Sequence, residues 1–170
     1  MKDRIVLIIV AAASIIITAI LYDPARIFIF KITEPCFANP LGNKQKAIRN
    51  DAFGDGEFGA RRSNGRYHTG IDIQAPVGTP VFASKSGLAF CGNVPTGYGK
   101  YVMIYHPDGY VTMYGHLSAW GVASTQKVRR GDLIGFVGKT GNAQNREIQP
   151  HLHFEIKKEG EPLDPDKLLK

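Results

Sequence analysis

The sequence predicts an all-β domain, built as an antiparallel sheet or sandwich and preceded by one N-terminal transmembrane helix. Two observations predict the β class. From residue 53 onward, short runs of β-branched and aromatic residues alternate with turn residues, and no stretch of helical periodicity separates them. A third observation, an uncharged apolar run at the N-terminus, predicts the helix.

A β-hairpin is the clearest local unit of the predicted sheet. The runs YVMIYH and YVTMY flank Pro107-Asp108-Gly109, in which proline restricts φ and glycine accepts a positive φ. We expect one short helical turn near the C-terminus, at residues 165–169. Further strands are expected at residues 81–83, 88–91, 133–137 and 153–156.

The N-terminal run IVLIIVAAASIIITAIL carries no charge. With Tyr22 it would span about 27 Å as a helix at ~1.5 Å per residue, close to the hydrocarbon thickness of a bilayer. No small-x-small cleavage site follows closely, so we interpret residues 1–22 as a signal anchor rather than a cleaved signal peptide. Lys2 and Arg4 favour a cytoplasmic N-terminus. The expected location is the cytoplasmic membrane, with the domain in the periplasm or cell wall, or secretion if the N-terminus is cleaved.

Residues 23–52 are interpreted as a connector and residues 53–170 as the domain. The connector holds prolines, a glycine and a basic polar run with weak periodicity. Cys36 lies in the connector and Cys91 in the domain, in a compartment that is expected to be oxidising. A disulfide between them and two unpaired thiols are both compatible with the sequence.

The formal net charge of +6 suits an anionic partner, such as nucleic acid, anionic lipid or an anionic cell-wall polymer. The chain has no basic helix pattern and no run of Lys or Arg interleaved with aromatic residues. Nucleic acid is therefore not expected as a partner.

Two histidine motifs predict a polar site on the sheet. Alternate residues of an extended strand face the same side. In HTGIDI, His68 and Asp72 therefore share one face with Gly70 between them, and the isoleucines face the other way. In PHLHFEI, His151 and His153 share a face in the same manner. Two polar pairs backed by apolar residues predict two strands that line one site.

Imidazole nitrogens and a carboxylate are suitable ligands for zinc. Three protein ligands leave the fourth position of a catalytic zinc for water, whose pKa then falls toward about 7. Such a water can attack an amide carbonyl that the same ion polarises. The spacing alone leaves open which of His151 and His153 binds the metal.

A wider set of motifs now resembles a known family. FGARR, HTGIDIQAPVGTPV, YVTMYGHLS, VRRGDLIGFVGKTG and PHLHFEI follow one another along the chain. Together they resemble the lysostaphin-like (LytM-type) zinc metallopeptidases, which cut peptide cross-bridges in bacterial peptidoglycan. The match covers residues 53–166 and contains the HxxxD, YxHL and HLHFE signatures of that family in order.

The resemblance implies roles for five residues. His68, Asp72 and His153 would hold one zinc ion per chain, and His116 and His151 would be the catalytic histidines. Strand parity does not predict His116, because it groups this residue with Tyr114. Which catalytic histidine acts as the base stays open.

Three neighbouring residues receive weaker interpretations. His106, beside the hairpin turn, belongs to no catalytic motif and is interpreted as structural or exposed. Arg61 matches an arginine of the family and would bind substrate or anchor a loop. Gln149 stands where the family commonly has glycine, which affects the shape of one groove wall.

The leading hypothesis is a membrane-anchored zinc endopeptidase that acts on the peptides of peptidoglycan. The alternative is a non-hydrolytic domain that keeps the peptidase fold and binds the wall or activates another hydrolase. A third hypothesis is a purely structural zinc. The presence of all five motif residues favours the enzyme. A regulatory protein that docks on the connector is a further candidate partner, and the bond that is cut stays open.

Overall fold

The computed structural model describes residues 24–42, 46–62 and 65–170. The predicted transmembrane segment, residues 1–22, lies outside the described residues. Within the described residues, no helix has the length and apolar character needed to cross a membrane. The chain divides into two compact units, Met1–Pro35 and Cys36–Lys170.

The first unit contains helix α2 (Pro24–Thr33), which lies in the predicted connector. Pro24 suits a helix start, because the first turn leaves backbone N–H groups unpaired in any case. At the other end, the Thr33 hydroxyl donates to the Ile29 carbonyl at 2.9 Å, and Glu34 N donates to Phe30 O at 2.8 Å.

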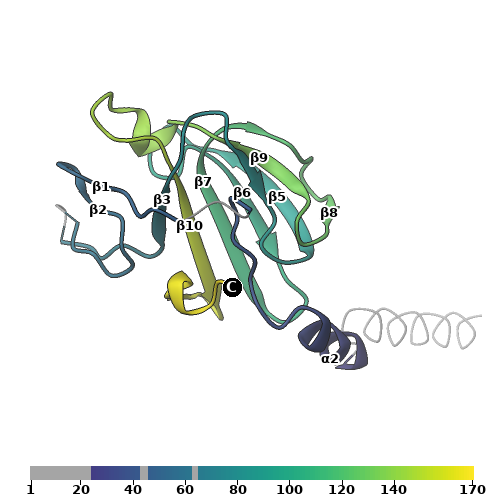
Figure 1. The fold of residues 1–170 in the computed structure, drawn as a ribbon. Helices are drawn as coiled ribbons and strands as arrows, with labels where there is room; N and C mark the ends of the chain where they lie inside the picture. The colour runs from purple at the N-terminus through teal and green to yellow at the C-terminus, as the bar shows by residue number, and fades with distance from the viewer. Residues whose placement is uncertain (1–23, 43–45, 63–64) are drawn as a thin grey trace, which may run out of the picture. The chain divides into compact units, whose positions relative to one another are not determined.

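The second unit contains all the described strands, and nine of them form one antiparallel sheet (Figure 1). The predicted all-β antiparallel class is therefore confirmed. The elements are β1 (Asn50–Asp51), β2 (Gly54–Asp55), β3 (Ile71–Gln74), β4 (Pro80–Phe82), β5 (Gly87–Asn93), β6 (Lys100–Tyr105), β7 (Tyr110–Trp120), β8 (Lys127–Val128), β9 (Leu133–Val137), η1 (Gly141–Gln144), β10 (His151–Lys158), β11 (Glu161–Leu163) and η2 (Pro165–Lys167).

Strand β10 organises the part of the sheet that carries the histidines. It pairs with β7 on one side and with β3 on the other, both antiparallel. In this register His153 lies opposite Asp72 on β3 and opposite Gly115 on β7. The pairing therefore brings the two predicted motifs, which are far apart in the sequence, side by side.

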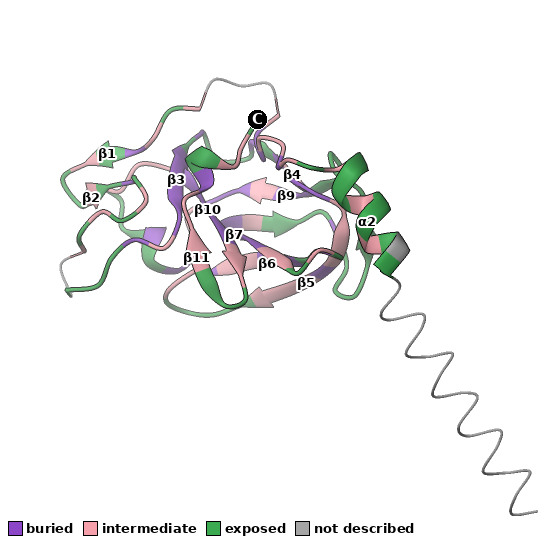
Figure 2. Ribbon diagram, turned by 90° about the horizontal axis from the view of Figure 1, so that it is seen from below, coloured by how far each residue is buried: buried purple, intermediate pink, exposed green. Residues whose placement is uncertain are grey.

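The hydrophobic core lies on one face of these strands, where Figure 2 shows buried residues along β3, β7 and β10. Ile71, Ile73, Leu152 and Phe154 are fully buried there. They alternate with the polar residues of the two motifs, as strand parity predicts. The packing of these core residues fixes the positions of the strand backbones. The polar side chains on the opposite face therefore extend from fixed backbone positions.

The predicted strands are present, with boundaries that differ most in β7. Strand β9 covers the predicted residues, and β6 and β7 form the predicted hairpin. The short 3-10 helix η2 occupies the predicted C-terminal turn. β7 continues beyond the YVTMY run to Trp120, because its second half pairs with β9.

Residues in 36–42 and 46–52, which the sequence places in the connector, contact the sheet. Phe37 and Leu41 are buried in the core, and Ile48 forms a bridge with Ile73. The second unit therefore begins at Cys36 rather than near residue 53. Cys36 and Cys91 are free thiols, which selects one of the two arrangements that the sequence leaves open.

A buried polar cluster surrounds the turn of the β6–β7 hairpin, and we call it the hairpin cluster. Its centre is His106, which is 5% exposed. The His106 ring bonds the Ser86 carbonyl through Nδ1 at 2.9 Å and the Thr112 hydroxyl through Nε2 at 2.9 Å. Lys85 and Asp108 form a buried ion pair beside it. His106 is therefore buried in a structural network, not exposed.

Candidate metal centre

Three of the predicted site residues, His68, Asp72 and His153, lie together and are buried. Asp72 Oδ1 is 3.1 Å from His68 Nε2 and accepts a hydrogen bond from His153 Nδ1 at 2.8 Å. The two nitrogens are 3.1 Å apart. Asp72 and His153 come from paired positions of β3 and β10, and His68 lies three residues before the start of β3.

The donor set and its spacing fit zinc. Bonds of about 2.0–2.1 Å in a tetrahedral site place ligand atoms roughly 3.3 Å apart. The three observed separations, 2.8, 3.1 and 3.1 Å, are close to that value. Among the residues that the structure describes, no other group of His, Cys, Asp or Glu has this arrangement.

The two histidines of this trio each have one ring nitrogen held by a second partner. His68 Nδ1 donates to the Glu57 carbonyl at 2.9 Å. His153 Nε2 donates to Glu155 Oε1 at 3.0 Å. Such outer contacts fix the ring orientation of metal-binding histidines and direct the other nitrogen toward the metal.

Glu155 is the buried carboxylate behind the trio. It also accepts hydrogen bonds from Thr69 and from the Tyr98 hydroxyl at 3.0 Å, and it pairs with Lys157 at 2.7 Å. Burial raises the pKa of Glu155, but the hydrogen bond and charge of His153 outweigh burial and lower it to about 2. The side chain is therefore an anion at neutral pH.

The charges of the two neighbouring carboxylates also act on His153. Burial lowers its pKa, but the hydrogen bonds to Asp72 and Glu155 raise it to about 9. A metal ligand must be deprotonated at the binding atom, so zinc would take the place of the Nδ1 proton. Zinc binding by His153 therefore involves proton release.

Asp72 uses its two oxygens for different partners. Oδ1 faces the two histidines, and Oδ2 receives Arg49 Nη2 at 3.0 Å and Arg62 Nη2 at 3.1 Å. Burial raises the pKa of Asp72, but the hydrogen bonds to His153 and His68 hold it well below its usual range. The carboxylate thus keeps the charge that a metal ligand needs.

The other two predicted residues, His116 and His151, form a second pair with ring centroids 4.9 Å apart. Each Nδ1 donates to a backbone carbonyl, of Thr140 at 2.8 Å and of Gln149 at 2.7 Å. Burial, with the neighbouring charges of His153 and His151, lowers the pKa of His116 to about 3. Burial also lowers the pKa of His151. Both rings are therefore neutral at pH 7, with Nε2 as the basic nitrogen.

His116 reaches the site because the backbone of β7 changes conformation there. Tyr114, two residues earlier, is fully buried in the core, and regular alternation would direct His116 to the same face. His116 instead has φ of +61°, in the left-handed region, and its N–H donates to the Tyr98 carbonyl at 2.7 Å. This unfavourable conformation is typical of functional positions.

Two glycines allow the loops that hold His116 to meet. A Cβ on Gly99 would lie 2.3 Å from Thr140 Oγ1, and one on Gly141 would lie 2.3 Å from Gly99 N. Both also have positive φ, of +65° and +62°. We call this contact the glycine seam. It brings the carbonyls of Tyr98 and Thr140 to His116 from two different loops.

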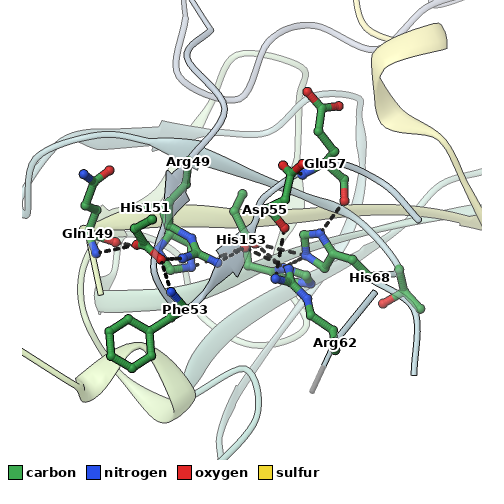
Figure 3. Close-up of polar contacts among 12 residues, drawn as sticks. Arg49, Phe53, Asp55, Glu57, Arg62, His68, Gln149, His151 and His153 are labelled. Carbon is green, nitrogen blue, oxygen red and sulfur yellow. Dashed lines mark hydrogen bonds and ion pairs between the residues drawn. The ribbon is translucent and has the colours of Figure 1, made fainter. Parts of the chain in front are cut away.

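Both histidine groups face one cavity of about 500 Å³. Figure 3 shows His68, His151 and His153 together with Arg49 and Arg62. The cavity combines basic, aromatic and imidazole groups. Its lining residues are Arg49, Phe53, Arg62, Arg66, Tyr67, His68, Thr69, Asp72, Gly97, Tyr98, His116, Asn142, Ala143, Ile148, His151, His153 and Glu155.

Sequence reasoning missed three charged residues of the site. Glu155 shares strand parity with His153, so the HLHFE run already contained its signal. Arg62, not the family-matched Arg61, contacts Asp72. Arg49 lies in the predicted connector, and no local pattern indicates it.

Comparisons with known proteins agree with this geometry. The sequence pattern of peptidase family M23 matches residues 66–165. DD-carboxypeptidase/endopeptidase Mpg of Neisseria meningitidis serogroup B is 49% identical over 100 residues, 59% of this chain and 22% of the relative. Peptidoglycan DD-endopeptidase ShyA of Vibrio cholerae is 41% identical over 97 residues, 57% of this chain and 22% of the relative. The chain spans about a fifth of the length of these two relatives.

A solved structure extends the similarity to the fold. The catalytic domain of the prophage-encoded M23 protein EnpA from Enterococcus faecalis, solved as a point mutant, superposes with a TM-score of 0.60 at 32% identity. The alignment covers 76% of this chain and 95% of that domain. The family match covers more than half of the chain, and it confirms the resemblance seen in the sequence motifs. The chain belongs to peptidase family M23.

Proposed function

We propose that the chain is a zinc-dependent endopeptidase that hydrolyses peptide cross-links of bacterial peptidoglycan. The observation that carries the proposal is the meeting of the His68–Asp72–His153 trio and the His116–His151 pair at one cavity. The names of these two relatives, a DD-carboxypeptidase/endopeptidase and a peptidoglycan DD-endopeptidase, support a DD-peptide bond of peptidoglycan as the target.

In this proposal one zinc ion is held by His68 Nε2, Asp72 Oδ1 and His153 Nδ1. When bound, zinc lowers the pKa of a water molecule toward neutrality and polarises the carbonyl of the scissile amide. Glu155 and the Glu57 carbonyl keep the two imidazoles in the orientation that binding requires.

The His116–His151 pair transfers protons in this proposal. His116 and His151 are neutral at pH 7, and their Nε2 atoms are on the rings that line the cavity. One Nε2 accepts the proton of the attacking water. The Nε2–H formed in this step then donates a hydrogen bond to the developing oxyanion and passes its proton to the leaving amine. His151 Nε2 lies 3.9 Å from Asp72 Oδ1, so the pair borders the metal trio directly.

The proposal places the domain outside the cytoplasm. Residues 1–22 would anchor the chain in the cytoplasmic membrane and present the sheet to the wall. The basic side chains at the cavity, such as Arg62 and Arg66, suit the anionic peptides of peptidoglycan.

The test is digestion of cross-linked peptidoglycan by the purified full-length chain, followed by mass spectrometry of the released muropeptides. We expect new amine termini that disappear with chelator, return with zinc and are absent for His153→Ala. This variant should also lose more than the ~100-fold in zinc affinity that outer contacts contribute. Stoichiometric zinc binding without cleavage of wall from any envelope type would contradict hydrolysis by this chain and favour the non-hydrolytic alternative.

A further inference from the structure

We propose that Arg49 is a positioning residue that couples the metal trio to His151. The inference rests on the proposed function, because it concerns the same site. It adds a residue that lies outside the part of the chain matched by the family pattern, residues 66–165. The coupling is a continuous series of polar contacts from Asp72 through Arg49, Asp51 and Gln149 to His151. Figure 3 labels Arg49, Gln149 and His151 along this series.

The first contact joins Arg49 to the metal trio. Arg49 is 4% exposed, and its Nη2 donates to Asp72 Oδ2 at 3.0 Å. Its backbone N–H also donates to the Asp72 carbonyl at 2.8 Å, so the two residues are joined at main chain and side chain. With Oδ2 held in this way, the carboxylate keeps Oδ1 toward His68 and His153.

The second contact leads from Arg49 to the loop before β10. Arg49 Nη1 donates to Asp51 Oδ1 at 2.5 Å. The other Asp51 oxygen, Oδ2, accepts the backbone N–H of Gln149 at 3.1 Å. Asp51 is therefore a bridge between the arginine and a segment that is remote in the sequence.

The third contact ends at the catalytic pair. The Gln149 carbonyl accepts the Nδ1 proton of His151 at 2.7 Å. This bond selects the tautomer in which Nε2 is the basic atom. Asp51 holds the N–H of Gln149, and His151 donates to the carbonyl of Gln149. The position of Gln149 therefore sets the orientation of the His151 ring.

Arginine is suited to this role because its planar fork can address two carboxylates at once. Lysine has one nitrogen on a flexible stem and cannot hold Asp72 and Asp51 in one fixed geometry. Arg62 provides a natural comparison. It donates to the same Asp72 Oδ2 at 3.1 Å and to the Asp55 carbonyl at 3.0 Å, and no contact with Asp51 is found among the described residues.

The experiment compares Arg49→Gln, Arg62→Gln and Asp51→Asn in the full-length chain. Zinc affinity is measured by chelator competition, and the His151 tautomer by ¹⁵N NMR of histidine-labelled protein. We expect Arg49→Gln and Arg62→Gln each to weaken zinc binding by about 10- to 100-fold. Only Arg49→Gln and Asp51→Asn should change the His151 Nδ1 signal and lower kcat at saturating zinc. Arg49 and Gln149 contact different oxygens of Asp51, and asparagine replaces one of these oxygens with an NH2 group that cannot accept, so one of the two contacts is lost.

Lys46→Gln is the matched control, because Lys46 lies in the same segment but pairs with Asp166. It should leave zinc affinity and the His151 signal unchanged. The proposal is overturned if Arg49→Gln changes the His151 signal and kcat no more than Arg62→Gln does. If Arg49→Gln does not fold, an unchanged His151 signal in Asp51→Asn overturns it. The NMR comparison needs no hydrolysis, so it stands apart from a failure of the proposed activity.

Discussion

The His116–His151 pair and the hairpin cluster both contain buried histidines, but they use the two ring nitrogens differently. In the hairpin cluster, His106 is bonded through both nitrogens, to Ser86 and to Thr112. At the cavity, His116 and His151 each bond a carbonyl through Nδ1, and Nε2 makes no hydrogen bond within the described part of the chain. A ring with both nitrogens bonded holds structure together, whereas a ring with one available nitrogen can exchange a proton.

The largest effect should come from the available nitrogens. We expect His116→Gln and His151→Gln each to lower kcat by about 100- to 10,000-fold, the usual contribution of general acid–base catalysis. Zinc stoichiometry should stay at one per chain, because neither residue belongs to the trio. Steady-state kinetics and metal analysis of the same samples provide the check. If a variant loses zinc together with activity, the replaced histidine belongs to the metal centre and not to the proton-transferring pair.

Next in size is the contact behind His153. Glu155→Gln keeps the volume of the side chain but removes the charge that holds His153 Nε2. We expect zinc affinity to fall by about 10- to 100-fold, the typical effect of losing an outer contact. Tyr98→Phe is the matched control, since it removes another hydrogen bond to the same oxygen and leaves the charge. Chelator competition should give Glu155→Gln a lower zinc affinity than Tyr98→Phe. The reverse order would count against Glu155 as the group that orients His153.

His106→Gln tests the other side of the comparison. It breaks buried hydrogen bonds and should lower the free energy of unfolding by about 1–3 kcal/mol. Zinc affinity should be unchanged, because His106 does not line the cavity. Urea denaturation and chelator competition measure the two quantities separately. A loss of zinc affinity in this variant would show that the two clusters are coupled.

The smallest effect per pH unit is a pH dependence of stability to which His116 contributes. Folding depresses the pKa of His116 from 6.5 to about 3, so the folded chain binds fewer protons than the unfolded chain between these values. The contribution of His116 to stability is therefore complete above pH 6.5 and falls by about 1.4 kcal/mol per pH unit below it. Urea denaturation with chelator from pH 6.5 to 4.5 should show this slope in the wild type, and His116→Gln should reduce it. Equal slopes would contradict the assignment.

The sequence predicted best the site residues that lie within regular strands. His68 lies before β3, where Thr69 and Gly70 form a bend, although it joins the same site. Alternation holds within β3 and β10, so Asp72, His151 and His153 could be placed on one face. His116 could not, because a single left-handed residue reverses the direction expected from parity.

The contribution of Arg49 depends on tertiary contacts. Its partner Asp72 is 23 residues away, and the segment around it has no periodic pattern. Segments such as β9 were predictable from local composition, whereas the start of the second unit at Cys36 was not, because the burial of Phe37 depends on the folded sheet.

The glycine seam determines which substitutions the gene can tolerate at Gly99 and Gly141. Gly99 and Gly141 have no side chain to offer to a substrate, yet almost any substitution there would force two loops apart and move both carbonyls that hold His116. In a library that samples every residue at every position, these two sites should reject alanine as strongly as the histidine itself rejects replacement. The gene is therefore expected to tolerate few substitutions at two positions whose residues have no side chain.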